Sequence, residues 1–127
     1  MTCTQSQRHL VQHLTGAALD YCVAQASRVE VTLGTYYGDV VVYHAPFEGR
    51  EYSPSTSWAQ GGPLLHQHGI SVAEIAKTRW HAHCQSVPGA CFVGKTPLEA
   101  AMRCLVAKRF GLEAPTLPEQ LHRYARP

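Results

Sequence analysis

The sequence predicts one small α+β domain, in which a mainly antiparallel sheet is flanked by two principal helices. The chain has 127 residues, which is enough for a single modest hydrophobic core. Apolar residues recur at helical spacing near residues 15–27 and 96–110, and β-rich runs with glycine-containing turns lie between them. No repeat or linker divides the chain. We therefore expect one domain over residues 1–127, with residues 1–8 and the C-terminal tail poorly ordered.

The first third of the chain is expected to form a helix followed by a hairpin. Thr15 supplies an N-cap hydroxyl, and the residues after it form one apolar stripe: Ala18, Leu19, Cys22, Val23 and Ala26. Asp20 falls outside that stripe. Two β-rich runs follow, at residues 29–33 and 39–44, and glycines bracket their short connection. This pattern predicts a β-hairpin.

The middle of the chain carries weaker signals. Pro63 suits the first turn of a helix, where its missing N–H has no partner to lose, and Gly69 is expected to end that helix. Residues 71–76 are compatible with a helical turn or with extended chain. Apolar and polar residues alternate over residues 80–84, which favours a half-buried strand. The Pro-Gly pair at residues 88–89 signals a turn.

The second principal helix has the clearest boundaries. Thr96 at the N-cap, Pro97 at the first helical position and Glu99 two residues later form a capping box. Glu99 and Arg103 are spaced as an i,i+4 ion pair, and Gly111 is expected to end the helix.

Composition disfavours some classes of function. The formal net charge is +2, charged residues make up 16% of the chain, and no run of Lys or Arg occurs, so we do not expect nucleic acid as a partner. No apolar segment has the length of a membrane span and no secretion signal is evident, so we expect a cytoplasmic protein without a membrane partner. The five cysteines share no C-x-x-C spacing and are expected to be free thiols.

Residues 52–63 form the most unusual stretch, with small hydroxyls, two aromatics, an amide and two glycines. Aromatic faces, hydrogen-bonding groups and backbone N–H groups near a helix start suit a small anionic ligand. The candidate ligand-binding residues are Tyr52, Ser55, Thr56, Ser57, Trp58, Gln60, Gly61 and Gly62, with Arg50 from the preceding turn. The alternative is structural: Trp58 anchors the core and the hydroxyls cap turns and helix ends.

The histidines raise the question of a metal. His81 and His83 would share one face of a strand and could hold one ion, whereas His66 and His68 would diverge on a helix. No H-E-x-x-H or C-x-x-C motif occurs, so solvated histidines are the favoured interpretation and we predict neither a metal site nor a cofactor.

One stretch matches the pattern of a phosphate-binding loop, G-x-x-x-x-G-K-[ST]. Gly89, Gly94, Lys95 and Thr96 satisfy it letter for letter. The sequence before it has only a weak strand pattern. The chain also lacks the carboxylate after a hydrophobic run (the Walker B motif) that accompanies such a loop. The favoured interpretation is a chance match at a helix cap, and we predict no catalytic residues.

Three blocks, at residues 14–24, 52–65 and 96–104, resemble the NinX-like family of small phage and prophage proteins. The resemblance implies a setting rather than a mechanism: an accessory protein made in an infected or lysogenic bacterium. Combined with the loop, it favours a non-enzymatic binder of a small anionic molecule or nucleotide through residues 52–63. The alternative is a protein-interaction module acting on a host or phage protein, and an NTPase or metal-dependent enzyme is a lesser one. A homodimer also stays open.

Overall fold

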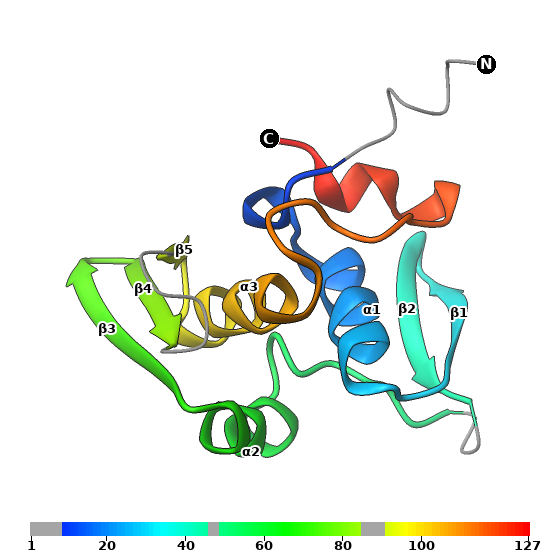
Figure 1. Cartoon of the computed structure of the whole chain (residues 1–127). Coiled ribbons are helices and arrows are strands. Elements are labelled where there is room, and N and C mark those ends of the chain that lie inside the picture. The colour runs from blue at the N-terminus through cyan, green and yellow to red at the C-terminus, as the bar shows by residue number, and fades with distance from the viewer. Residues whose placement is uncertain (1–8, 46–48, 85–90) are drawn as a thin grey trace.

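The computed structural model describes residues 9–45, 49–84 and 91–127 (Figure 1). It confirms a single small α+β domain, although its strands form two small antiparallel sheets. The expected fraying of residues 1–8 and the turn at residues 88–89 lie outside the described residues. The elements, in chain order, are η2 (Val11–His13), α1 (Gly16–Ser27), β1 (Val31–Tyr36), β2 (Asp39–His44), α2 (Trp58–His68), β3 (Ile70–Ala76), β4 (Arg79–Cys84), β5 (Phe92–Gly94), α3 (Pro97–Phe110) and η3 (Glu119–Ala125).

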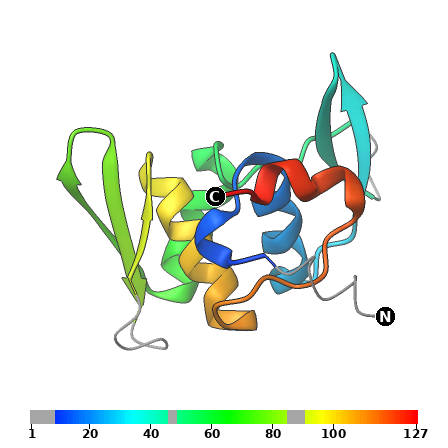
Figure 2. The ribbon, with the colours of Figure 1, turned by 90° about the horizontal axis from the view of Figure 1, so that it is seen from above.

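The two principal helices form the centre of the molecule. Figure 2 shows α1 and α3 between the β3–β4–β5 sheet on one side and the β1–β2 hairpin on the other. Both helices bury apolar side chains in the core, among them Leu19, Val23, Met102 and Leu105. Because α3 lies between α1 and a sheet, nearly all of its faces are covered.

The structure confirms the predicted hairpin, as β1–β2, and shows that residues 71–76 belong to a second hairpin, β3–β4. In the turn of β1–β2, Tyr37 and Gly38 have φ values of 50° and 85°, as a two-residue type I′ turn requires. The segment whose structure was open, residues 71–76, belongs to strand β3, which pairs antiparallel with β4. The strand expected at residues 80–84 is confirmed as β4.

Helix α2 begins five residues earlier than expected. The prediction placed Pro63 in the first turn, but the helix begins at Trp58 and Pro63 lies inside it. The carbonyl of Ser57 accepts hydrogen bonds from the N–H groups of Gln60 (3.1 Å) and Gly61 (2.7 Å), which starts the helix upstream of the proline. Gly69 ends the helix in a left-handed conformation (φ 64°), as predicted.

The N-cap role of Thr96 at α3 is confirmed, and Glu99 completes the capping box one residue upstream of its usual place, on Lys95. The Thr96 hydroxyl accepts from the Glu99 N–H (3.1 Å), and the Glu99 carboxylate accepts from the Lys95 N–H (2.8 Å). Arg103 pairs with Glu99 (3.6 Å) but is also buried, and its guanidinium donates to the carbonyls of Leu14 and Val93. This arginine therefore joins three segments, which a surface ion pair would not do.

The C-terminal segment, expected to be a poorly ordered tail, contributes to the core. Leu117, Leu121 and Ala125 are buried, and η3 crosses α1 (Figure 1). Thr15 ties it down: its N–H and its hydroxyl both donate to the carbonyl of Tyr124 (2.7 and 3.0 Å). The predicted use of the Thr15 hydroxyl as a helix cap is therefore wrong, because that hydroxyl makes a tertiary hydrogen bond instead. Among the described helices, none is long and apolar enough to cross a membrane.

Candidate functional site

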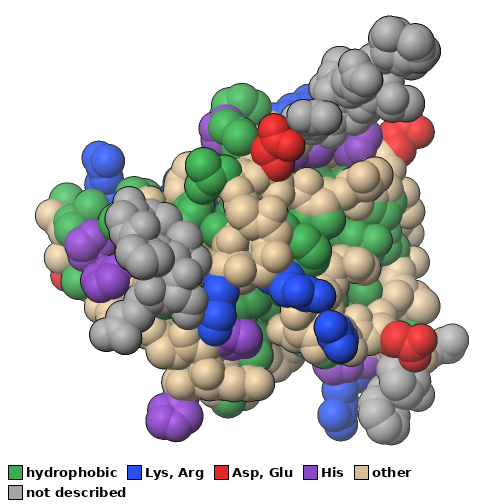
Figure 3. Space-filling view, in the orientation of Figure 1, with side chains coloured by type: hydrophobic (Ala, Val, Ile, Leu, Met, Phe, Trp, Pro, Cys, Tyr) green, Lys and Arg blue, Asp and Glu red, His purple; other side chains and the backbone are tan. Residues whose placement is uncertain are grey.

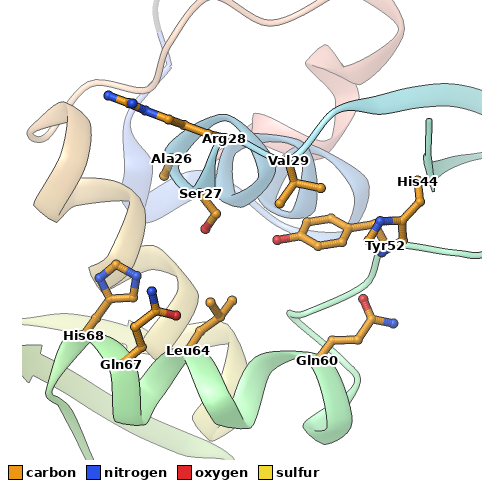
Figure 4. Close-up of a pocket in the computed structure, with 10 residues that line it drawn as sticks. All are labelled: Ala26, Ser27, Arg28, Val29, His44, Tyr52, Gln60, Leu64, Gln67 and His68. Carbon is orange, nitrogen blue, oxygen red and sulfur yellow. The ribbon is translucent and has the colours of Figure 1, made fainter. Parts of the chain in front are cut away.

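An open cleft lies where the C-terminal ends of α1 and α2 meet (Figure 4). Its volume is about 510 Å³, within the usual range for small-molecule sites. We call it the α1–α2 cleft. It is lined by Ala26, Ser27, Arg28, Val29, His44, Tyr52, Gln60, Leu64, Gln67 and His68.

Two helix ends shape the cleft. α1 stops because Arg28 adopts a left-handed conformation (φ 58°) and its N–H returns to the carbonyls of Ala24 and Gln25. The chain then turns toward β1, which leaves Ser27 and Arg28 at the rim. α2 stops at Gly69, which leaves His68 on the opposite side.

Tyr52 supplies the most deeply placed polar group. Its ring contacts the edge of His44 (5.0 Å between centroids), and its N–H donates to the Val42 carbonyl (2.8 Å). Figure 4 shows the hydroxyl pointing into the cleft toward Ser27. Burial raises the pKa of Tyr52 to about 12, and the nearby Ser27 hydroxyl lowers it slightly, so the phenol stays neutral at physiological pH.

Beside the cleft, the Ser27 hydroxyl is a polar group without a hydrogen-bond partner among the described residues. Its oxygen is shielded from solvent and meets hydrogen-bond geometry with no group in the described part of the chain. Its proximity to Tyr52 therefore falls short of a hydrogen bond. A shielded hydroxyl without a partner carries a desolvation cost that a bound polar group would relieve.

Gln60 forms a fixed part of the wall. Its side-chain oxygen accepts from the Ser53 N–H (3.0 Å), and its side-chain nitrogen donates to the Glu51 carbonyl (3.1 Å). The amide thus holds the chain around Tyr52 in place. Its own hydrogen-bonding capacity is largely used by the backbone.

The rim carries positive charge. Arg28 lines the cleft, and the Lys108 ammonium donates to Nδ1 of His68 (3.1 Å) on the opposite side. Desolvation and the Lys108 charge lower the pKa of His68, so this imidazole is neutral at pH 7. No Asp or Glu of the described residues lines the cleft. Figure 3 shows Lys and Arg side chains across the middle of this face, with the visible acidic side chains toward its margins.

The helix dipoles oppose these charges. Two helix C-termini face the cleft, and each is equivalent to about half a negative charge, with effects of roughly 0.3–1 kcal/mol at an exposed end. Arg28 and Lys108 together carry two full positive charges, so the net local charge is positive.

The structure separates the predicted site residues. Tyr52 and Gln60 line the cleft. Thr56 and Trp58 are exposed outside its lining, with 56% of Trp58 accessible. The others lie outside the lining as well: Ser55 and Gly61 are buried, Ser57 is the N-cap of α2, Gly62 follows within that helix, and Arg50 is exposed in the preceding turn.

The expectation that Gly61 presents its backbone N–H to a ligand is wrong. That N–H donates to the Ser57 carbonyl (2.7 Å) within the first turn of α2. A Cβ at this position would lie 2.3 Å from the Pro54 carbonyl oxygen and 2.8 Å from Leu98 Cδ2. Glycine is needed here for close packing.

Asp20 is a residue that sequence reasoning missed. It is 6% exposed, and its carboxylate accepts the Ser55 N–H (2.8 Å), which fastens the turn before α2 to α1. Burial is the main cause that raises the pKa of this carboxyl to about 7. The one available signal was its place beside Leu19 in an alanine-rich helix, whose small side chains let neighbours approach on several sides.

The segment that matches a phosphate-binding loop does not have that structure where it is described. Residues 92–94 form strand β5, and the N–H of Val93 donates to the Gln12 side chain (3.1 Å). A Cβ on Gly94 would lie 2.6 Å from the Ala100 nitrogen, so this glycine packs against α3. Gly89 lies outside the described residues.

The histidines of β4 lie on one face, as predicted. The ring centroids of His81 and His83 are 6.1 Å apart, and His81 Nδ1 lies 3.4 Å from Cys91 Sγ. Over residues 9–45, 49–84 and 91–127, no three His, Cys, Asp or Glu side chains are grouped closely enough to hold a metal ion.

These features define a small single-domain α+β protein with an open cleft between two helix ends. The family model described as Bacteriophage P22, NinX matches residues 11–109. The chain therefore belongs to the NinX family of phage proteins, which confirms the resemblance seen in its three sequence blocks. The matched span contains every residue that lines the α1–α2 cleft. A search of curated proteins found no match.

Proposed function

We propose that this phage protein is a non-enzymatic binder of a small anionic ligand in the α1–α2 cleft. One observation carries the proposal: the hydroxyls of Tyr52 and Ser27 converge in a cleft that has positive charges at its rim and no acidic residue among its described lining. The setting is the cytoplasm of the host bacterium, where nucleotides and other phosphorylated metabolites supply ligands of this class.

The cleft offers different groups to different parts of such a ligand. Tyr52 is a neutral donor and Ser27 an unused donor and acceptor at the bottom. Val29 and Leu64 supply apolar walls for a base or a ring. In Figure 4 the Arg28 side chain extends outward, away from the Tyr52 hydroxyl and Gln60, so it would have to turn back toward the cleft to contact the anionic group.

The free-energy contributions of these groups predict modest affinity for the ligand. A charge-assisted hydrogen bond to an arginine contributes roughly 1.5–3 kcal/mol, and ordering its exposed side chain costs roughly 0.5–1.5 kcal/mol. The opposing helix ends reduce the gain further, by up to about 1 kcal/mol each. The arginine thus contributes at most about 2.5 kcal/mol, and most of the affinity would come from the other groups of the cleft. We expect dissociation constants in the micromolar to millimolar range, about 4–8 kcal/mol of binding free energy.

The test is a thermal-shift screen of nucleotides and phosphorylated metabolites, followed by calorimetry. A ligand at one hundred times its Kd should raise the free energy of unfolding by about 2.7 kcal/mol. Tyr52→Phe, which removes only the hydroxyl, should weaken a hit about fivefold to tenfold. Arg28→Gln should weaken anionic hits but not neutral analogues.

Two controls match these variants. Tyr37→Phe removes a hydroxyl from a tyrosine that is 89% exposed at the hairpin turn, and Arg109→Gln removes an exposed charge at the end of α3. Neither residue lines the cleft, so both variants should bind normally. The proposal fails if no compound in the screen raises the melting temperature, or if Tyr52→Phe and Tyr37→Phe bind equally well.

A second candidate function is contact with a host or phage protein. Tyr36 and Tyr37 at the β1–β2 turn are 63% and 89% exposed and pack edge to face (4.4 Å between centroids). Exposed aromatics of this kind are enriched in protein interfaces. A photo-crosslinking residue in place of Tyr37 should give one discrete adduct in infected cells. A self-adduct would indicate a homodimer, and the absence of any adduct would count against this role.

A further inference from the structure

A second cavity lies at the opposite end of α3 from Lys108. It has a volume of about 370 Å³ and is bordered by the β3–β4 turn, β5 and the first two turns of α3. Its charged lining residues are Lys77, Arg79, Lys95, Glu99 and Arg103, and we call it the basic pocket.

Among the described lining residues, Arg103 and Glu99 already form an ion pair with each other. The Glu99 carboxylate lies 3.6 Å from the Arg103 guanidinium and also accepts the Lys95 N–H (2.8 Å). The Arg103 guanidinium donates to the Leu14 carbonyl as well (3.0 Å). Arg103 and Glu99 thus form a neutral, fixed back wall.

Three positive charges remain at the mouth. Lys77 and Arg79 flank Thr78 in the β3–β4 turn, and Lys95 follows β5. Within the described residues, none of the three makes an ion pair. Three like charges around one cavity repel one another, and an anion bound between them would remove that repulsion.

The first turn of α3 does not itself hold the anion. Its capping box already uses the Thr96 hydroxyl and the Glu99 carboxylate. A ligand in the basic pocket would therefore be held by the side chains of Lys77, Arg79 and Lys95. The dipole of the 14-residue helix adds a favourable field at this end, in contrast to its effect at the α1–α2 cleft.

We propose that the basic pocket is a second anion site, which takes a compact dianion of the phosphate class, either free phosphate or the phosphoryl group of a small metabolite. A dianion suits three separate cations better than a single carboxylate does, and the guanidinium of Arg79 can bind two phosphate oxygens at once. The volume leaves room for a phosphoryl group and little more than a sugar. This site is separate from the α1–α2 cleft and does not depend on the function proposed for it.

The test uses inorganic phosphate and pyrophosphate as probes, with calorimetry and amide chemical shifts at constant ionic strength. Pyrophosphate should bind the wild-type protein and shift the amide signals of Thr78, Gly94 and Lys95. Lys95→Gln and Lys77→Gln should each weaken binding about fivefold, the effect of one lost charge contact near the surface. If methyl phosphate gives the same amide shifts, the ligand is a phosphorylated metabolite; if only the inorganic ions do, it is free phosphate.

A third variant tests whether removing a negative charge from the basic pocket strengthens pyrophosphate binding. Glu99→Gln keeps the capping box, because glutamine also serves at this position, but it removes the one negative charge among the described lining residues. This variant should bind pyrophosphate about fivefold more tightly. Structural damage would instead weaken binding, so the expected gain distinguishes an electrostatic effect from misfolding.

Two further variants test whether binding is specific to the basic pocket. Arg109→Gln removes an exposed charge outside the pocket and should leave the affinity unchanged, whereas Tyr52→Phe tests whether the anion binds in the α1–α2 cleft instead. The proposal is overturned if pyrophosphate does not bind at millimolar concentration, or if Lys95→Gln and Arg109→Gln weaken it equally. Loss of pyrophosphate binding in Tyr52→Phe would assign the anion to the cleft and would also overturn it.

Discussion

Asp20 should make this protein less stable as the pH rises toward neutrality. The side chain is 6% exposed, and its one backbone partner among the described residues is the Ser55 N–H at 2.8 Å. Desolvation is the largest influence on its carboxyl and raises the pKa from 3.8 to about 7. The hydrogen bond to Ser55 lowers that pKa, and the charge of Glu51 raises it, by smaller amounts.

The direction of the pH effect follows from proton linkage. Between about pH 4 and pH 7 the folded protein keeps the Asp20 proton while the unfolded chain releases it, so stability falls as pH rises through this window. Below pH 4 both states are protonated and the penalty is absent. A shift of about three pKa units corresponds to a penalty of roughly 4 kcal/mol above pH 7.

Asp20→Asn removes the charge and keeps the shape. The amide oxygen can still accept the Ser55 N–H, while a buried NH₂ without a partner costs roughly 1–2 kcal/mol. We therefore expect the variant to be more stable than wild type by about 2–3 kcal/mol at pH 8 and close to wild type or slightly less stable at pH 4.5. Urea unfolding followed by tryptophan fluorescence at pH 4.5, 6 and 8 measures the difference.

The comparison of variant with wild type removes the contribution of the eight histidines, which titrate in both proteins. Asp39→Asn is the matched control, because the Asp39 side chain is 79% exposed and its pair with Arg123 is long (3.8 Å). This control should change stability by less than about 0.5 kcal/mol at every pH. If Asp20→Asn is less stable than wild type at pH 8, the carboxylate is stabilised in the folded protein and the desolvation reasoning is refuted.

Substitutions at four other positions have defined outcomes in urea unfolding at pH 7. Gly61→Ala forces a Cβ to within 2.3 Å of the Pro54 carbonyl and should cost about 1–3 kcal/mol, whereas Gly62→Ala meets only an ordinary 3.6 Å contact and should be neutral or stabilising by up to about 1 kcal/mol. Equal effects of the two would contradict the packing account. Arg103→Met removes a buried guanidinium that donates to two carbonyls and should cost at least about 1–3 kcal/mol; a neutral result would mean that water replaces it. Thr96→Ala should cost about 1 kcal/mol through loss of the helix cap, and Thr96→Ser should restore most of it.

The elements that sequence predicted well depend on neighbouring residues. Thr96, Glu99 and Gly111 define α3 through contacts within the helix or just beyond it, and the structure confirms both ends. The β1–β2 hairpin likewise depends on its own turn. The start of α2 was predicted too late because Pro63 is a strong local signal. The competing cause, close packing of Gly61 against Pro54, involves tertiary contact that no local pattern reveals.

The candidate site was predicted only in part, because local sequence patterns do not reveal tertiary contacts. Tyr52 and Gln60 come from the stretch whose composition attracted attention, and both line the α1–α2 cleft. Arg28 and His68 also line it, and Lys108 contacts His68, yet these three residues lie on three different helices or their ends. Only the packing of those helices brings them together, and no spacing along the chain encodes that.

The composition of residues 52–63 now has two separate physical causes. Ser55 and Gly61 serve packing: one fastens the turn to Asp20, and the other lets α2 approach Pro54 and Leu98. Tyr52 instead directs a hydroxyl into the cleft, toward Ser27. A substitution at Ser55 or Gly61 would therefore change stability and ligand binding together, whereas Tyr52→Phe removes only a hydroxyl that points into the cleft and leaves the packing in place. For this reason the hydroxyl of Tyr52 is the atom on which a binding role for this stretch can be tested separately from its role in the fold.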